Sequence, residues 1–278
     1  MTFNHLSKNG EVRPIGDAVV SVENIEYAYG FGVYEAIRVS NGIVYFIDDH
    51  IERLIESARI ISLEHPFTPE IVKKAIFDLV EKTEERTFNL KILLIGASKK
   101  EEANMYILCF NPLFPDKKLY RDGVSLDVAH YERVFPHAKT LNMLQSYLAF
   151  RGARAKGLYD AILINRDDYI TEGTRTNFYT IKEKTIFTPR EEQILLGVTR
   201  KAVLFVAKKN GFTVQEKDIR LEDLPEYDGA FITSTSSKIL PVKRAGGFEY
   251  KEIPSEILTL MKAFGDFLEK NSGVLPKE

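Results

Sequence analysis

The sequence lacks a second cysteine, a long apolar run and an excess of charge of either sign. Cys109, in the apolar run MYILCF, cannot form a disulfide within the chain and is expected to be a buried core thiol. No apolar stretch approaches the roughly 20 residues that cross a bilayer, and residues 1–12 show no signal-peptide pattern. We therefore expect no membrane partner, and a cytoplasmic location is the default.

The charge balance argues against a nucleic-acid partner. The formal net charge is only -2, and lysines and glutamates are scattered along the chain. A surface dedicated to nucleic acid would instead cluster its basic residues on one stripe. With 44% hydrophobic and 28% charged residues, the composition is that of an ordinary soluble globular protein.

A chain of 278 residues can bury a large core and is long enough for two domains. The Pro-rich, charged stretch PLFPDKKLYRDG is the natural boundary between them. We expect a small N-terminal α+β domain in residues 1–115, a boundary strand and interdomain loop in 116–137, and a larger C-terminal domain in 138–278.

The first third of the chain predicts two helices between short strands. Strand-like runs at 19–25 and 42–47 precede a helix at 50–63, where apolar residues recur at helical spacing. The helix at 68–85 has Thr68 as its N-cap and proline in its first turn. Two runs rich in strand-forming residues follow, at 88–97 and 104–111.

The second half predicts mixed sheets with few helices. A strand at 124–134 leads to a helix at 140–157, with Leu141, Leu144 and Leu148 on one face. Strand pairs at 159–173 and 177–189 follow each other directly, and 229–242 is another pair. Between them lies a helix that ends at Gly211 and would have Thr199 as its N-cap. This order favours an α+β fold with mixed sheets over a strict βαβ repeat.

Lys139 lies among small and apolar neighbours in PHAKTLNML, where a loop is predicted to turn into a helix. Most lysines lie on solvated faces, and that interpretation is open here. A lysine held near a helix N-terminus and an apolar wall can instead become a neutral amine that attacks a carbonyl and forms a Schiff base.

Other polar positions also admit two interpretations. Gly197, Val198 and Thr199 in LLGVTRKAV form either an ordinary helix start or a phosphate site, because unpaired N–H groups and the helix dipole favour an anion. The turn TSTSSK could hold the same anion. Glu172 is either an exposed turn carboxylate or the partner of a ring nitrogen, and Arg53 is either a surface charge or a phosphate ligand.

Six ordered motifs carry a resemblance to a known family: YAYGFGVYEAIRV, HIERL, KTLNML, YITEGTRTNF, ILLGVTR and TSTSSKILPV. Together they resemble the fold-type IV, or class IV, aminotransferases over nearly the whole chain. The resemblance implies pyridoxal 5'-phosphate as the cofactor, in the cleft between a smaller N-terminal and a larger C-terminal domain. It also implies at least a homodimer, in which the neighbouring subunit helps to close the site, and it implies no metal site.

The resemblance assigns roles to individual residues. Lys139 resembles the Schiff-base lysine, Glu172 the acidic partner of the pyridine nitrogen, and Asn177 the support of the Glu172 turn. Leu195 resembles the residue that packs against the ring. The residues that resemble phosphate ligands are Arg53, Val198, Thr199, Ser234 and Thr235. The implied reaction is a ping-pong transfer of an amino group between an amino acid and a 2-oxo acid.

The substrate motifs point in two directions. YGFGVYEAIR resembles the branched-chain pattern, in which aromatic residues and an arginine line the side-chain pocket. The Arg-x-His carboxylate trap of the D-amino-acid enzymes is missing from ASKKEEAN. However, KTLNML and TSTSSKILPV resemble the D-amino-acid and lyase branch, and Leu144 stands where the branched-chain pattern has tyrosine. The substrate-binding residues that the resemblance implies are Tyr29, Tyr34, Arg38, Lys91, Thr235 and Ser236.

We therefore predict an aminotransferase that favours branched-chain L-amino acids. D-amino-acid transamination and an aminodeoxychorismate lyase that forms 4-aminobenzoate are the alternatives. Lys91 stands where the branched-chain pattern has an arginine for the distal carboxylate of glutamate or 2-oxoglutarate. Lysine keeps the charge but not the bidentate fork, so the use of this acceptor stays open.

Overall fold

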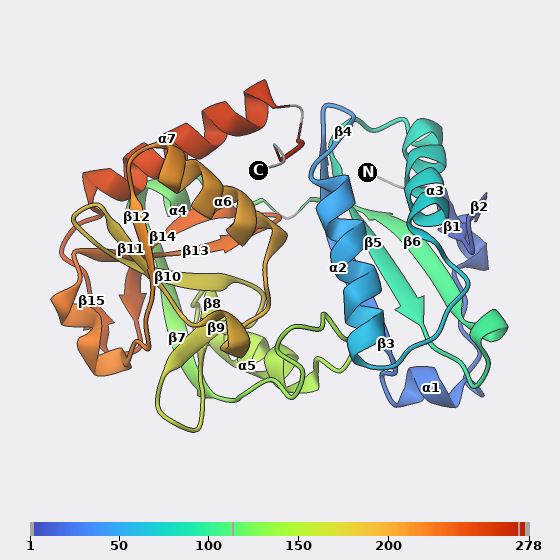
Figure 1. The fold of residues 1–278 in the computed structure, drawn as a ribbon, viewed down its shortest axis with the longest axis horizontal. Coiled ribbons are helices and arrows are strands. Elements are labelled where there is room, and N and C mark those ends of the chain that lie inside the picture. Colours follow the sequence, from blue (N-terminus) through green and yellow to red (C-terminus); the bar gives the residue numbers. More distant parts are fainter. Residues whose placement is uncertain (1–2, 113, 272, 276–278) are drawn as a thin grey trace. The chain divides into compact units, whose positions relative to one another are not determined.

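The computed structural model of the chain describes residues 3–112, 114–271 and 273–275 (Figure 1). They form two compact units. The first unit contains the described residues of 3–112, 137–142 and 273–275, and the second contains 114–136 and 143–271. The segment that carries Lys139 thus clusters with the first unit, whereas the sequence assigned residues from 138 onward to the C-terminal domain. The predicted domain boundaries otherwise stay a prediction.

The first unit is built on a six-stranded antiparallel sheet with the strand order β2-β1-β6-β5-β3-β4. Its strands are β1 (His5–Lys8), β2 (Glu11–Pro14), β3 (Gly32–Ser40), β4 (Ile43–Val44), β5 (Phe88–Ile95) and β6 (Asn104–Phe110). Its helices are α1 (Ile25–Ala28), α2 (Ile47–Ile60) and α3 (Pro69–Lys82), with short 3-10 turns at η1 (Ile15–Asp17) and η2 (Lys100–Glu102).

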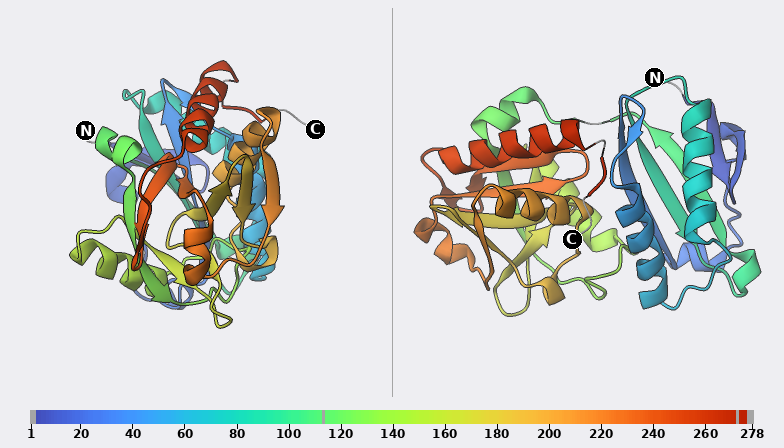
Figure 2. Two further views of the ribbon diagram at one scale, coloured as in Figure 1. Left: turned by 90° about the vertical axis from the view of Figure 1, so that its left-hand side faces the viewer. Right: turned by 45° about the horizontal axis from the view of Figure 1, so that its top comes forward.

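Helices α2 and α3 cover one face of this sheet (Figures 1 and 2). Strand β3 alternates accordingly: Val33, Ile37 and Val39 are buried in the core under these helices, while the side chains between them, except Glu35, face the other side. Cys109 is buried in the same core, as predicted, and burial raises the pKa of its thiol to about 11.

The predicted helices of this unit are confirmed, and Thr68 caps α3 by accepting a hydrogen bond from the Ile71 N–H at 3.4 Å. The strand predicted at 19–25 is wrong. These residues form a turn that leads into α1, because the Asn24 side chain accepts the Tyr27 N–H at 2.6 Å and starts a helix there. The strand predicted at 42–47 is reduced to β4, since α2 already begins at Ile47.

The second unit is built on a nine-stranded sheet, whose mixed strand directions agree with the prediction. Its strands are β7 (Val124–His130), β8 (Asp160–Ile164), β9 (Ile170–Gly173), β10 (Asn177–Lys182), β11 (Thr185–Thr188), β12 (Thr213–Glu216), β13 (Gly229–Ser234), β14 (Lys238–Ala245) and β15 (Phe248–Glu249). Its helices are α4 (Lys117–Asp122), α5 (Leu144–Ala155), α6 (Val198–Lys209) and α7 (Ser255–Lys270), with 3-10 turns at η3 (Glu191–Gln193) and η4 (Leu221–Glu226).

The sheet of the second unit closes on itself. Strand β10 pairs with β13 on one side and with β9 on the other, so the path β10-β13-β14-β7-β8-β9 returns to its start. The closing pair consists of Glu172 on β9 and Asn177 on β10. Two residues that the sequence singled out therefore meet at the point of closure.

Two predicted helix starts are wrong. Helix α5 begins at Leu144 rather than at 140, so Leu141 lies outside it, and Leu144 is 63% exposed. Lys139 is therefore not at a helix N-terminus. Helix α6 has Gly197 rather than Thr199 as its N-cap and ends at Lys209, just before Gly211. In the part of the chain that the structure describes, no helix has the length and apolarity to cross a bilayer.

Candidate active site

Lys139 lies in an extended segment that pairs with the beginning of β3. The Tyr34 N–H donates to the Lys139 carbonyl at 2.9 Å, and the Leu141 N–H donates to the Gly32 carbonyl at 2.8 Å. These bonds satisfy backbone groups that a helix would otherwise pair, which is why the predicted helix does not start at 140. Lys139 is thus held by the sheet of the first unit.

Gly32, in YGFGVYEAIR, makes this close approach possible. A Cβ atom at Gly32 would lie 2.6 Å from Leu141 Cδ1 and 2.7 Å from the Leu94 carbonyl oxygen. Any side chain here would displace the Leu141 side chain and would clash with the backbone of β5. Close packing therefore explains why glycine stands at position 32 in this motif.

The Lys139 side chain extends over an aromatic ring. Its Nζ lies 4.5 Å from the centroid of the Tyr34 ring, and Lys91 Nζ lies 5.8 Å from the same centroid. Cations at these distances are attracted to the face of the ring. Lys91 pairs across the sheet with Ala36, and Tyr34 and Arg38 flank Ala36 on that face of β3. The structure therefore gathers four predicted residues: Tyr34, Arg38, Lys91 and Lys139.

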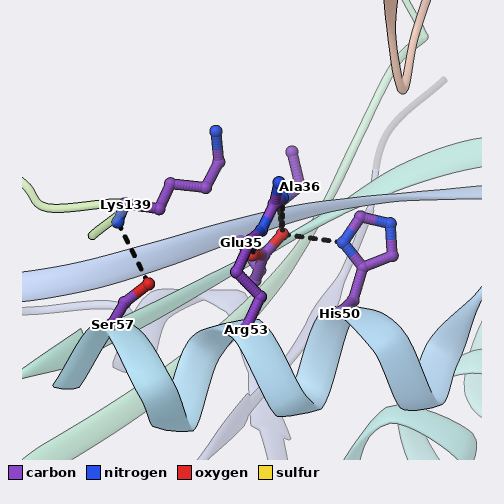
Figure 3. A network of polar contacts seen from close by, with 6 residues as sticks. All are labelled: Glu35, Ala36, His50, Arg53, Ser57 and Lys139. Atoms are coloured by element: carbon purple, nitrogen blue, oxygen red, sulfur yellow. Dashed lines mark hydrogen bonds and ion pairs between the residues drawn. The ribbon is translucent and has the colours of Figure 1, made fainter. Parts of the chain in front are cut away.

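Glu35 points to the opposite side, toward α2, and is fully buried there (Figure 3). Its carboxylate accepts from Arg53 Nε at 2.6 Å and from a terminal Arg53 nitrogen at 2.8 Å, and His50 Nδ1 lies 2.7 Å from Oε2. His50, Arg53 and Ser57 are spaced i, i+3 and i+7, so they share the face of α2 that looks at β3.

The charges around Glu35 decide its ionisation. Burial raises the pKa of its carboxyl, but the charges of Arg53 and His50 and their hydrogen bonds outweigh burial and hold this pKa well below its usual range. Burial lowers the pKa of His50, against the opposing effect of Glu35. Glu35 is therefore a carboxylate paired with Arg53. The phosphate role of Arg53 stays a prediction, and its side chain is 12% exposed.

Sequence reasoning missed Glu35, His50 and Ser57. A signal was present for the first, because a glutamate between Val33 and Ile37 occupies a core-facing position of the strand and so requires a buried partner. The spacing of His50 and Arg53 in HIERL is a second signal, since residues three apart share a helix face.

In the second unit Glu172 is nearly fully buried, and Arg133 and Leu195 both lie against its carboxylate. Arg133 Nε lies 2.5 Å from its Oε1, and the Leu195 N–H donates to its Oε2 at 3.4 Å. Asn177 donates from its side-chain amide to the Leu195 carbonyl at 2.8 Å. The structure thus brings together Glu172, Asn177 and Leu195, and the exposed-turn interpretation of Glu172 is wrong. The roles of these residues toward a cofactor stay a prediction. Arg133 was missed, and nothing in its loop sequence points to Glu172.

Helix α6 starts beside this cluster. A Cβ atom at Gly197 would lie 2.1 Å from Asn177 Oδ1, so only glycine fits between the helix start and Asn177. Among the residues that the structure describes, no side chain caps α6, so the backbone N–H groups of its first turn, which includes Val198 and Thr199, have no side-chain cap. Such a helix start favours an anion. This donor set, with a buried carboxylate nearby, fits a phosphorylated pyridine cofactor.

The remaining predicted residues lie in less distinctive settings. Ser234 and Ser237 share a hydrogen bond of 2.6 Å between their hydroxyl oxygens in the turn between β13 and β14, and half-buried Thr235 and Ser236 form the tip of that turn. Tyr29 is 78% exposed at the end of α1.

Comparison with protein families gives one match over most of the chain. Residues 32–245 match the family model described as amino-transferase class IV. The matched range contains nearly all of the predicted site residues, from Tyr34 to Ser236, and leaves out only Tyr29.

Comparison with curated proteins gives relatives with two different activities in their names. The chain is 32% identical to a D-alanine aminotransferase of Bacillus licheniformis over 86% of this chain and 87% of the relative. It is 30% identical to a putative branched-chain-amino-acid aminotransferase of Methanocaldococcus jannaschii over 94% of this chain and 96% of the relative.

Solved structures share the fold. The branched-chain amino acid aminotransferase of Escherichia coli matches with a TM-score of 0.89 at 24% identity, over 99% of this chain and 97% of that one. The branched-chain aminotransferase of Thermoproteus uzoniensis with norvaline matches with a TM-score of 0.84 at 28% identity, over 95% and 97% of the two chains. The α+β architecture expected from the sequence is thereby confirmed as the fold-type IV architecture.

Proposed function

Because the chain belongs to the class IV aminotransferases, which use pyridoxal 5'-phosphate, we propose that it transfers the amino group of branched-chain L-amino acids to a 2-oxo acid. The observation that carries this proposal is the face of β3 beside Lys139. There the lysine amine lies over the Tyr34 ring, and the half-buried, apolar Leu93 pairs with Tyr34 across the sheet. An aromatic and aliphatic wall of this kind suits an apolar substrate side chain.

Pyridoxal phosphate, when bound, supplies an aldehyde carbon and a conjugated ring that draws in the electrons of a broken Cα–H bond. We propose that Lys139 binds the aldehyde carbon through Nζ and that Glu172 accepts a hydrogen bond from the protonated pyridine nitrogen. The phosphate ligands in this proposal are the N–H groups and hydroxyls of Arg53, Val198, Thr199, Ser234 and Thr235, and Leu195 packs against the ring.

Lys139 is also the proposed base. With the cofactor in place, the free Lys139 Nζ would take the proton from the substrate Cα as general base and would hold it as an ammonium for return as general acid. The bonds that Tyr34 and Ser57 make to its backbone hold the lysine in place for both transfers. Arg133 Nε lies beside Glu172 Oε1, and in our proposal a Glu172 carboxylate favours a protonated ring nitrogen.

Acceptor choice depends on the cations of the same sheet face. Arg38 and Lys91 flank Ala36 there, one along β3 and the other across the sheet, and either could bind the carboxylate of a 2-oxo acid. Lys91 binds as a point charge rather than as a fork, so we expect weaker discrimination for 2-oxoglutarate than an arginine would give. Tyr29, Tyr34, Thr235 and Ser236 are the other proposed substrate contacts.

D-amino-acid transamination is the second candidate. It is favoured by the D-alanine aminotransferase of Bacillus licheniformis, which is as similar to this chain as the branched-chain relative is. It is also favoured by Leu144 at the position where the branched-chain pattern has tyrosine. The missing Arg-x-His trap argues against it. A homodimer or higher homo-oligomer in the cytoplasm is part of our proposal for either substrate.

Half-reactions test the substrate directly. The purified protein is loaded with pyridoxal phosphate and mixed with single L- or D-amino acids, while absorbance follows conversion of the cofactor to its aminated form. We expect L-leucine, L-isoleucine and L-valine to react first. Reaction with D-alanine and with no L-amino acid would overturn the substrate proposal, and pyruvate release from aminodeoxychorismate would indicate the lyase instead.

A further inference from the structure

The backbone of Lys139 is bound by a serine that neither the motifs nor the family resemblance single out. The Lys139 N–H donates to Ser57 Oγ at 3.0 Å, and Ser57 is fully buried on the inner face of α2. On its other side the Lys139 carbonyl accepts the Tyr34 N–H at 2.9 Å. The backbone of Lys139 is therefore held at its N–H group by α2 and at its carbonyl oxygen by β3.

Figure 3 shows what this arrangement does to the side chain. The Lys139 N–H faces α2 and Ser57, whereas the side chain extends away from α2. Its Nζ ends 4.5 Å from the centroid of the Tyr34 ring. A lysine amine sits at the end of four rotatable methylenes, so its position is defined only as well as that of its Cα atom.

We propose that Ser57 is a positioning residue for Lys139: it fixes the lysine backbone so that the amine returns to the same place over Tyr34 after each exchange with substrate. This inference rests on the proposed function of Lys139 as the reactive amine. Proton transfer depends steeply on geometry, because a misplacement of about 1 Å can cost about 100-fold in rate.

Ser57 also stabilises the fold, and this effect must be separated from its effect on the position of Lys139. Removing the hydroxyl leaves the Lys139 N–H without its acceptor inside the protein, which destabilises the fold whatever the lysine does. The matched control is Ser7 on β1, which is also fully buried and whose hydroxyl has no hydrogen-bond partner in the described structure. Ser7→Ala deletes the same group without touching Lys139.

The experiment is a double-mutant cycle with chemical rescue. Ser57→Ala is expected to lower kcat at least about 10-fold with little change in KM, and Ser7→Ala to leave both within about twofold. In a Lys139→Ala background, where added methylamine supplies the base, Ser57→Ala should cause no further loss of the rescued kcat. Equal losses in both backgrounds, or a wild-type kcat in Ser57→Ala, would overturn the proposal.

Two further measurements keep the test independent of activity and folding yield. Amide hydrogen exchange should become faster at Lys139 in Ser57→Ala and stay unchanged there in Ser7→Ala. Ser57→Cys, which keeps a weak acceptor of similar size, should give a kcat between those of wild type and Ser57→Ala. If Lys139→Ala alone keeps the wild-type rate, the proposed function fails, which is distinct from a failure of the Ser57 proposal.

Discussion

Glu35 is the residue on which the polar contacts beneath β3 converge. It occupies a core-facing position between Val33 and Ile37, where an apolar side chain would be the ordinary choice. A buried carboxylate is tolerated only when it is paired and hydrogen-bonded. Arg53 meets it with two nitrogens and His50 with one, so the sequence places a charge in the core together with its partners.

Glu35→Gln tests the importance of this pair. The glutamine amide cannot accept both Arg53 N–H groups, which leaves the largely buried guanidinium without its counter-charge. Breaking a buried pair in this way costs about 3–5 kcal/mol. We expect a loss of that size in the free energy of unfolding, measured by urea titration at pH 7.

The control for Glu35→Gln lies on the same helix as Arg53. Glu56 makes a bidentate pair with Arg59 on the exposed side of α2. Exposed pairs contribute little, because water screens them and two long side chains must be ordered. Glu56→Gln should therefore leave the unfolding free energy almost unchanged. Equal losses in the two variants would show that burial of the Glu35 pair is unimportant.

At the scale of helices and strands, periodicity in the sequence predicted most of the fold. The helices α2 and α3 and the strands β5 to β11 follow from apolar spacing and turn residues. The start of α5 does not, because residues 140 and 141 pair with β3 and a distant strand overrides local helix preference. The role of Arg133 could not be predicted for the same reason, because its partner Glu172 is distant in the sequence and close only in the folded chain.

The candidate site divides in a similar way. Lys139, Glu172 and the start of α6 are predicted site residues because their motifs resemble those of a family. The resemblance assigns no role to Glu35 or Ser57. The alternation along β3 nevertheless indicates that Glu35 is a charged residue at a core-facing position. Ser57 looks like any helix serine until Lys139 is placed against it. Residues that act through another residue are harder to predict than those that resemble a motif.

The start of α6 gives a prediction about the cofactor. Gly197→Ala places a Cβ atom 2.1 Å from Asn177 Oδ1, although alanine tolerates the backbone φ of -66°. Either Asn177 leaves the Leu195 carbonyl or the helix start shifts. Both changes disturb the N–H groups that we expect to bind phosphate, so affinity for pyridoxal phosphate should fall about 10-fold or more. Absorbance titration of the cofactor measures this.

Gly265→Ala is the matched control for this prediction. Gly265 lies inside α7, and a Cβ atom there would meet nothing within 4 Å. Alanine is favoured over glycine in a helix interior by about 1 kcal/mol, so this variant should be slightly more stable. Its cofactor affinity should not change. Unchanged affinity in Gly197→Ala as well would show that the start of α6 does not bind the phosphate.

At the scale of the molecule, each unit brings its own chemistry. The first unit holds the amine of Lys139 and the cations of β3 and β5. The second closes its sheet with the Glu172 and Asn177 pair, so the acidic residue is fixed by the strand pairing of the whole unit rather than by a loop. Glu172 thus rests on a strand, and Lys139 is fixed by the pairing of its segment with β3, which favours accurate positioning of both.

Acid should lower the free energy of unfolding through protonation of Glu35. The folded state keeps this carboxyl ionised to a lower pH than the unfolded chain, where protonation occurs near the ordinary pKa of 4.5. The unfolded state therefore takes up the proton first, and the stabilisation present above pH 4.5 is lost as the pH falls below that value. Glutamine does not titrate, so the difference in unfolding free energy between wild type and Glu35→Gln should narrow from pH 5 to pH 3. Urea titrations across that range measure it, and a constant difference would contradict a lowered pKa for Glu35.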